Sequence, residues 1–376
     1  MANNNQPALS AAIRSAQICV PCADLAATLD FFTGRLGFRL EVIFPADAPE
    51  TAIVAGPGVT LRLEKTDARV AFPPVLRLLC DLSALPEGAA RALTAPNGMR
   101  VELVDADPPL NLPPVKQEFV ISRANDEAAW GLGRAGMEYR DLIPGRLGGR
   151  FVASHIRIPA GGEVPDYVHF HQIRFQMIYC KTGWVRVVYE DQGPPFVLEA
   201  GDCVLQPPEI RHRVLEASPG LEVIEIGCPA IHETRADHRL SLPTPHIRPE
   251  RLFGGQRFAR HIARETPWHA GPFEGWETRG TGLAGATQGL ASVRVVRANT
   301  TPVSVSRTHL GEFLFLFILQ GALNIDSHVK GNHLLHTGDS CVIPAGLEFA
   351  YQAEPNLEML VVTLPAELPQ AEPPTT

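Results

Sequence analysis

One pattern of strand-like runs and tight turns occurs twice in this chain of 376 residues. Gly136–Arg140 is echoed by Gly275–Arg279, and Phe175–Gly183 is echoed by Phe313–Gly321. Further echoes join Phe151–Pro159 to Leu290–Arg297, Gly201-Asp202 to Gly338-Asp339, and Pro207 to Pro344. Short alternating runs bounded by glycine and proline indicate barrels or sandwiches, so the repeat predicts two related, mainly β domains.

The first copy of the repeat carries a group of histidines. His169 and His171 are two residues apart, so their imidazoles point to the same face if this segment is a strand. Gln176 follows at an odd spacing and shares that face only if the chain bends or changes strand. His212 lies far along the chain and must return on a separate strand. The grouping therefore depends on a fold that brings separate strands together.

The spacing of these residues resembles the two motifs of the cupin family. The first motif is G-x5-H-x-H-x4-E-x6-G. Its leading glycine is replaced here by Glu163, and its glutamate by Gln176. His169, His171 and Gly183 match the other positions. The second motif, G-x5-P-x4-H, is matched by Gly201, Pro207 and His212. The resemblance implies a double-stranded β-helix, or jelly-roll, barrel with one divalent transition metal bound by His169, His171, Gln176 and His212. Imidazole and carbonyl-oxygen ligands suit Fe(II), which we favour, and also Mn(II), Ni(II) or Zn(II).

The second copy has lost these residues. The counterparts of the four expected ligands are, in the same order, Arg307, His309, Leu314 and Phe349. One histidine cannot hold a metal that needs three or four protein ligands, so we expect one metal per chain, in the first barrel. The second barrel is expected to be structural, with a polar site at His309 and Glu312 as the alternative. The chain thus resembles a bicupin whose second barrel is degenerate.

The segment before the repeats reads as a small α+β module with the element order βαβββ. Asp24–Phe38 resembles the glyoxalase and bleomycin-resistance family, the vicinal oxygen chelate fold, and Pro96–Leu103 is similar to its closing strand. That family binds metal with one residue from each of several strands. Gln17 and Glu102 fall at two such places, whereas the counterpart near Arg62 cannot bind a metal. We interpret the module as degenerate, serving as a lid, an oligomer contact or a ligand-gating surface.

The composition indicates which partners and which cellular compartment are expected for this protein. The net charge is −8 and no basic run stands out, so we expect no nucleic-acid partner. The chain shows no charged-then-apolar leader and no apolar run of about 18 residues, so we expect a cytoplasmic protein without membrane association. Seven scattered cysteines fit reduced thiols. The cupin resemblance implies a homodimer.

These patterns divide the chain into five parts. They are a glyoxalase-like module at 11–110, the metal-binding barrel at 130–232, a linker at 233–273, the degenerate barrel at 274–365 and a disordered tail at 366–376. The expected fold class is therefore mainly β, with two cupin barrels preceded by the small α+β module.

Two enzyme classes fit the expected site. The first, which we favour, is a dioxygenase acting on a small organic acid or phenolic compound, since ring-cleaving bicupins of the gentisate type have similar motifs. The second is a redox-neutral isomerase or lyase for a sugar acid or oxo-acid, since a cupin family that linearises unsaturated uronates uses a similar His, His, Gln, His set. A non-catalytic ligand-binding bicupin is a third reading, and no general base is apparent. The polar residues expected to orient a small-molecule substrate are Tyr167, Arg174, Tyr179 and Gln206.

Overall fold

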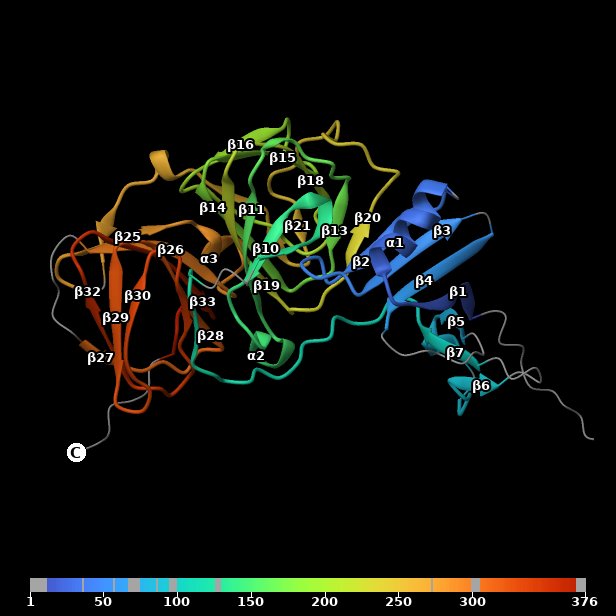
Figure 1. Ribbon diagram of the computed structural model, residues 1–376, viewed down its shortest axis with the longest axis horizontal. Coiled ribbons are helices and arrows are strands. Elements are labelled where there is room, and N and C mark those ends of the chain that lie inside the picture. The colour runs from blue at the N-terminus through green and yellow to red at the C-terminus, as the bar shows by residue number, and fades with distance from the viewer. Residues whose placement is uncertain are drawn as a thin grey trace, which may run out of the picture. The chain divides into compact units, whose positions relative to one another are not determined.

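The computed structural model describes residues 12–369, except 36, 57, 67–74, 86, 95–99, 126–129, 272 and 299–304. The described chain consists mainly of β-strands with a few short helices, which confirms the predicted mainly β class (Figure 1). It divides into two compact units, Met1–Asn111 with Glu233–Ala236 and Leu112–His232 with Asp237–Thr376. No helix in the described part of the chain is long and apolar enough to cross a membrane.

The first unit follows the predicted βαβββ order. Its elements are β1 (Ile13–Cys22), α1 (Leu25–Asp30), β2 (Arg39–Phe44), β3 (Thr51–Gly56) and β4 (Val59–Lys65), followed by β5 (Val75–Cys80), β6 (Ala92–Thr94) and β7 (Arg100–Asp105). These strands form a sheet of order β2-β3-β4-β1-β5-β7-β6. The Asp24 carboxylate accepts a hydrogen bond from the Ala27 backbone N–H and caps α1, which packs on the sheet through buried Leu25.

Gln17 and Glu102 flank an arginine on this sheet. In the strand register Arg77 pairs with Gln17 on one side and with Glu102 on the other, so the three side chains lie in one row. The guanidinium groups of Arg100 and Arg77 lie 3.1 Å and 3.9 Å from the Glu102 carboxylate. A cation therefore separates the two residues that were expected at ligand positions, and Glu102 is already ion-paired.

The first repeat, within the second unit, consists of two antiparallel sheets. Its strands are β9 (Trp130–Leu132), β10 (Glu138–Asp141), β11 (Val152–Ile158), β12 (Gly162–Glu163), β13 (His169–His171), β14 (Phe175–Thr182), β15 (Trp184–Tyr189), β16 (Phe196–Glu199), β17 (Cys203–Leu205), β18 (His212–Ala217), β19 (Leu221–Cys228) and β23 (Ala259–His261). One sheet has the order β23-β17-β14-β19-β11-β10-β9, and the other contains β16-β15-β18-β13 with β12 paired to β18. Side chains of both sheets, among them Cys180, Val187 and Val223, share one buried core.

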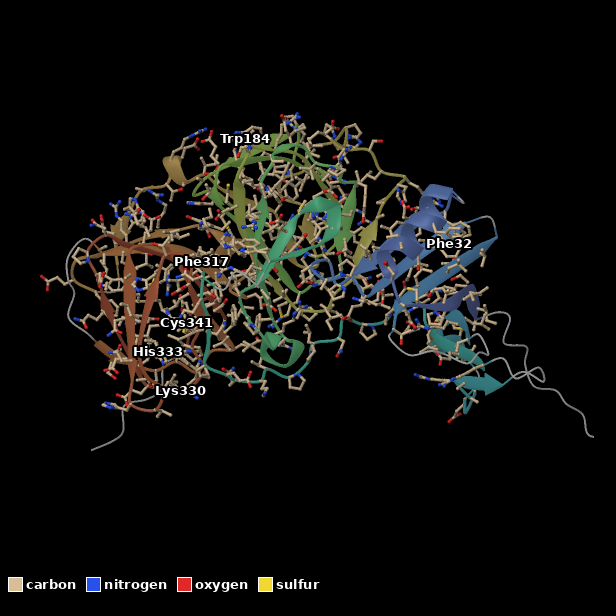
Figure 2. The ribbon with its side chains drawn as sticks, viewed as in Figure 1. Phe32, Trp184, Phe317, Lys330, His333 and Cys341 are labelled. Atoms are coloured by element: carbon tan, nitrogen blue, oxygen red, sulfur yellow. The ribbon has the colours of Figure 1, made fainter. Side chains whose placement is uncertain are left out.

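The second repeat has the same plan. Its strands are β8 (Val120–Ser122), β24 (His269–Ala270), β25 (Trp276–Gly280), β26 (Ser292–Ala298), β27 (Val305–Arg307), β28 (Phe313–Gln320), β29 (Ala322–Ser327), β30 (Gly331–His336), β31 (Ser340–Val342), β32 (Phe349–Ala353) and β33 (Leu357–Leu364). They form sheets of order β24-β25-β26-β33-β28-β31-β8 and β27-β32-β29-β30. Phe317 and Cys341, on the neighbouring strands β28 and β31, are both buried (Figure 2).

Each repeat is completed by a strand from the segment that precedes the other repeat. β8 precedes the first repeat but pairs with β31 of the second, and β23 precedes the second but pairs with β17 of the first. The same contact follows both strands, since the Ala124 N–H donates to Asp339 over 2.8 Å and the Ala263 N–H donates to Asp202 over 2.9 Å. The segment expected as a linker therefore also builds a sheet.

A shared apolar core joins the two repeats. The rings of Phe151 and Phe313 stack with centroids 4.1 Å apart and planes 11° apart, and both side chains are fully buried. Beside them the Glu312 carboxylate accepts hydrogen bonds from Arg150 over 2.6 Å and from Arg174 over 3.0 Å. Glu312 therefore binds the first repeat and does not form the alternative polar site of the second.

Glu222 on β19 gives the fold an acid-sensitive contact. Its carboxylate accepts a hydrogen bond from His155 over 2.8 Å and pairs with Lys181. The His155 hydrogen bond, opposed by burial and aided by Lys181, lowers the pKa of Glu222 from its ordinary 4.5 to about 2. Because the pKa is lower in the folded state, the stabilisation is complete above about pH 4.5 and disappears as the pH falls toward 2.

We therefore expect Glu222→Gln to lower the free energy of unfolding by about 1–2 kcal/mol at pH 7, after discounting for the exposed 30% of the side chain. Near pH 2 the variant and the parent protein should have almost the same stability. Urea denaturation at both pH values checks this, with Glu216→Gln, a more exposed carboxylate paired with Arg186, as the control. An equal loss at both pH values would contradict the assignment.

Candidate metal centre

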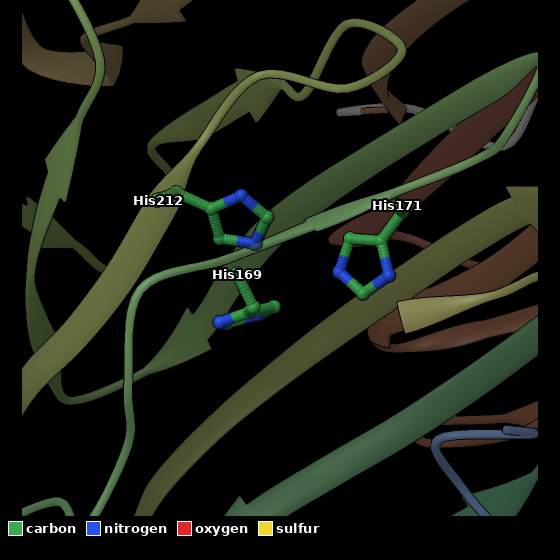
Figure 3. A group of neighbouring side chains, drawn as sticks. All are labelled: His169, His171 and His212. Atoms are coloured by element: carbon green, nitrogen blue, oxygen red, sulfur yellow. The ribbon is translucent and has the colours of Figure 1, made fainter. Parts of the chain in front are cut away.

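Three histidines of the first repeat lie together in the structure. His169 and His171 are the two ends of β13, and His212 begins β18 opposite His169 in the strand register. One ring nitrogen from each residue lies within 4.8 Å of the other two, and all three side chains are buried. Figure 3 shows the three rings grouped around a common space. Two strands that are distant in sequence thus build the cluster.

Backbone carbonyls fix the orientation of two of the rings. Nδ1 of His169 donates to the Tyr167 carbonyl over 2.8 Å, and Nδ1 of His212 donates to the Ile210 carbonyl over 3.0 Å. When Nδ1 carries the proton, the lone pair is on Nε2, which is the atom left to accept a bond. Such hydrogen bonds set the tautomer of a metal-binding histidine and hold its ring in place.

The surroundings keep all three imidazoles neutral at pH 7. Burial, helped by the charge of Arg134, holds the pKa of His169 well below its usual range. Burial and the neighbouring His212 do the same to the pKa of His171, and burial lowers the pKa of His212 to about 4. A histidine must be deprotonated to bind a metal, so these three are ready to do so without losing protons.

Gln176, the expected fourth ligand, lies in the same repeat. It shares a face of β14 with Ile178 and Cys180, which pack into the core between the two sheets. Its Nε2 donates to the Glu225 carboxylate over 2.5 Å, whereas its Oε1 is buried and has no hydrogen-bond partner in the described part of the chain. An unpaired buried carbonyl oxygen is costly, and a cation satisfies it. Three imidazole nitrogens and one amide oxygen fit a divalent transition metal.

A buried arginine contacts the cluster. Nη2 of Arg134 lies 3.0 Å from Nε2 of His169, and Nη1 pairs with Asp166, whose other oxygen accepts from the Val214 N–H over 2.9 Å. Burial alone would lower the pKa of Arg134, but Asp166 more than offsets it and raises that pKa. The side chain therefore stays cationic. A metal would need the same Nε2 lone pair, so metal binding requires Arg134 to release His169.

Two of the residues expected to orient a substrate lie near this cluster. The Tyr167 ring lies 5.8 Å from the His169 ring, and its hydroxyl is buried. Gln206 Nε2 donates to the Tyr189 hydroxyl over 2.9 Å, and the Tyr189 ring stacks 5.5 Å from the His212 ring. Tyr167 therefore touches the site directly, whereas Gln206 supports a ring beside it.

The other two have different surroundings. Arg174 hydrogen-bonds both oxygens of Glu312 over 3.0 Å and so links the repeats. Tyr179 is three residues after Gln176 on β14, so strand alternation turns it to the opposite face. There it is buried in the core shared by the two repeats, and burial raises its pKa. The contacts of both residues described here stabilise the fold, Arg174 through Glu312 and Tyr179 in the shared core.

The structure adds residues that the motifs did not identify. They are Arg134, Asp166, Tyr189, Glu225 and His232, whose ring lies 5.3 Å from that of His171. Glu225 left a signal, because it is a carboxylate within the apolar run of β19. No sequence signal marks Arg134 or Asp166, because each lies outside the motifs and is identified only by its contacts in the folded structure.

No protein-family model and no curated protein matches this chain. Among solved structures, the chain is similar to a salicylate 1,2-dioxygenase from Pseudaminobacter salicylatoxidans (TM-score 0.49, 16% identity, 67% of this chain and 86% of that one). It is also similar to the R92A mutant of Bacillus subtilis oxalate decarboxylase (TM-score 0.46, 11% identity, 69% of this chain and 79% of that one). A third similar structure is protein YlbA from E. coli (TM-score 0.45, 13% identity, 68% of this chain and 94% of that one). All three are cupin or bicupin proteins. Likenesses this weak assign neither a reaction nor a substrate to this chain.

Proposed function

We propose that the first repeat is a metal-binding cupin barrel and that the protein is a mononuclear-metal dioxygenase acting on a small organic acid or phenolic compound. The observation that carries this proposal is the meeting of three buried, neutral histidines with the cation of Arg134. The second repeat is then a degenerate cupin barrel, and the first unit a glyoxalase-like module without its own metal.

The proposed ligands are His169, His171, His212 and Gln176, which together supply four neutral donor atoms. A divalent metal held by four protein atoms would supply a Lewis acid with open positions for substrate and O2. The protein's own contribution is to hold the ligand rings through Tyr167 and Ile210 carbonyls and to enclose the site in the core between the sheets.

Arg134 is proposed to bind the acidic group of the substrate. Its guanidinium is held by Asp166 on one side, and its second NH2 group faces the imidazole cluster. A guanidinium is a planar fork that matches a carboxylate or a phenolate, and it stays charged when buried. The aromatic ring of Tyr167 lies against it, with the Arg134 guanidinium carbon 5.6 Å from the ring centroid.

A redox-neutral isomerase or lyase is the second candidate. Its support is the amide of Gln176, because a ligand set without a carboxylate leaves the metal its full charge and favours an enolate-like ligand. The two candidates differ in one measurable respect. The dioxygenase consumes O2 in proportion to substrate, whereas the isomerase turns its substrate over equally well under nitrogen.

The test is a screen of metal-reconstituted protein against small phenolic and aliphatic acids, with an oxygen electrode and with product analysis under nitrogen. Oxygen uptake that needs both the acid and the metal supports the dioxygenase. Turnover without O2 replaces it with the second candidate. No turnover of any acid by protein shown to hold one equivalent of metal would leave a ligand-binding protein.

Arg134→Gln is expected to raise KM for the acid found in that screen by about 10–100-fold, because a charged hydrogen bond to the substrate is worth about 1.5–3 kcal/mol. Metal content should not fall, since Arg134 is not a proposed ligand and its removal frees Nε2 of His169. Steady-state kinetics check this, with the exposed, ion-paired Arg186→Gln as the control. A loss in kcat with unchanged KM would speak against a role in substrate binding.

A further inference from the structure

The second repeat contains a cavity of about 50 Å³ at the place that corresponds to the metal centre of the first. The counterparts of the four expected metal ligands all line it, namely Arg307, His309, Leu314 and Phe349. The internal duplication has therefore kept a hollow at this position and changed the chemistry of its wall. This inference does not depend on the function proposed for the first repeat.

His309 cannot donate a nitrogen lone pair into the cavity. Its Nδ1 accepts from the Gly311 N–H over 3.2 Å, and its Nε2 donates to the Ile343 carbonyl over 3.0 Å. Both ring nitrogens are thus occupied by backbone groups. In the described residues of this repeat, no three His, Cys, Asp or Glu side chains gather as metal ligands would. The cavity is not built for a metal.

Two arginines give the cavity its charge. Arg307 is the last residue of β27, its Nε is buried without a hydrogen-bond partner among the described residues, and its guanidinium carbon lies 4.4 Å from the Phe273 ring centroid. Arg294 enters from β26, and burial and Arg307 lower its pKa against the opposing effect of Tyr351. No carboxylate of the described chain forms an ion pair with either. Two neighbouring, partly buried cations without an anion are unfavourable, so an anion bound between them would be stabilised.

A neutral donor points to the same kind of ligand. Trp276 is 3% exposed and lines the cavity, yet its Nε1–H has no acceptor in the part of the chain that the structure describes. The Tyr351 ring stacks on it with centroids 6.4 Å apart. An indole N–H can only donate, so the missing partner is an acceptor. Guanidinium and indole donors around one small space together match a carboxylate.

Thr308 adds one more polar group to the wall, and the rest of the lining is apolar. The apolar residues are Phe273, Val296, Leu314, Phe349, Met359, Val361 and Leu368. The volume holds about four water-sized groups, which matches a short acid better than an aromatic one. We propose that the second repeat binds a short-chain aliphatic carboxylate, with its charged end between Arg294 and Arg307 and its alkyl end against the apolar wall. Inorganic phosphate fits less well, because four polar oxygens would meet this wall.

Isothermal titration calorimetry of the full-length protein with propionate tests the proposal. We expect one site per chain, at least about tenfold weaker binding in Arg307→Met and in Arg294→Met, and no binding of neutral propionamide. Arg297→Met is the matched control, because Arg297 lies on the same strand but is ion-paired with Glu277 over 2.8 Å. Each variant is first shown to be folded by its thermal transition. Propionate should raise the transition temperature of the wild type and of Arg297→Met, but not that of Arg307→Met or Arg294→Met.

Several results would overturn the proposal. They are absence of heat and of any thermal shift with propionate, binding that survives both arginine substitutions, and phosphate binding in preference to propionate. Because Arg134 could also hold a carboxylate, Arg134→Gln is titrated in parallel. Binding lost in that variant and kept in Arg307→Met would move the carboxylate to the first repeat and refute the site described here. Binding kept in Arg134→Gln supports it.

Discussion

Replacing His171 by alanine should reduce bound metal from about one equivalent to below about 0.1 equivalent per chain. The site would keep two imidazoles and the Gln176 oxygen, which is one donor fewer than the proposed set of four. Substitutions that merely disturb the orientation of a ligand cost 10–100-fold in affinity, so loss of a ligand should cost at least about 100-fold. Elemental analysis after purification in air and after anaerobic reconstitution measures this.

The second repeat offers a matched control for that experiment. His309 occupies the position that corresponds to His171, is equally buried, and has both ring nitrogens bonded to backbone groups. His309→Ala should therefore retain the metal. If the wild type takes up none of Fe(II), Mn(II), Ni(II) or Zn(II), or if His171→Ala keeps a full equivalent, the metal centre is refuted.

Phe313→Ala should produce the largest loss of stability, about 3–5 kcal/mol in the free energy of unfolding. The side chain is fully buried and stacks on Phe151, and the cluster around it draws residues from both repeats. Its removal leaves a cavity that neither sheet can close alone. Because the core is shared, we expect both repeats to unfold at a lower urea concentration, with tryptophan fluorescence and circular dichroism changing together.

Leu310→Ala, three residues away and 54% exposed, serves as the control and should change the stability by less than about 0.5 kcal/mol. Separate transitions for the two repeats in Phe313→Ala would show that this core does not couple them. A loss no larger than that of the control would show that the stacked rings contribute little.

The repeat and its strands could be predicted from the sequence because they depend on local patterns. Alternation, turn glycines and the His169-x-His171 spacing are properties of short segments, and the fold repeats them in both copies. The prediction that Tyr179 orients a substrate conflicts with the same alternation rule. Its three-residue distance from Gln176 already places it on the other face of the strand, so its distance from the site follows from alternation alone.

The charged neighbours of the site could not be predicted in this way. Arg134 reaches His169 only because a separate segment lies beside β13, and Arg174 finds Glu312 across a sequence separation of 138 residues. An arginine in a sequence does not reveal which carboxylate or imidazole it will meet. Such pairs are set by tertiary packing, and they decided which of the expected polar residues face the histidines and which join the repeats.

The exchange of β8 and β23 has a consequence for any attempt to divide the protein. A fragment cut between the repeats would carry one strand that belongs to the other half and would lack one of its own, leaving β17 or β31 as an open edge. Open edges recruit strands from other molecules. A half that is expressed alone should therefore associate with other copies of itself or aggregate. The two halves expressed together should assemble into one complex. Because each repeat needs a strand from the segment of the other, neither repeat can be deleted from the protein or transferred to another protein by itself.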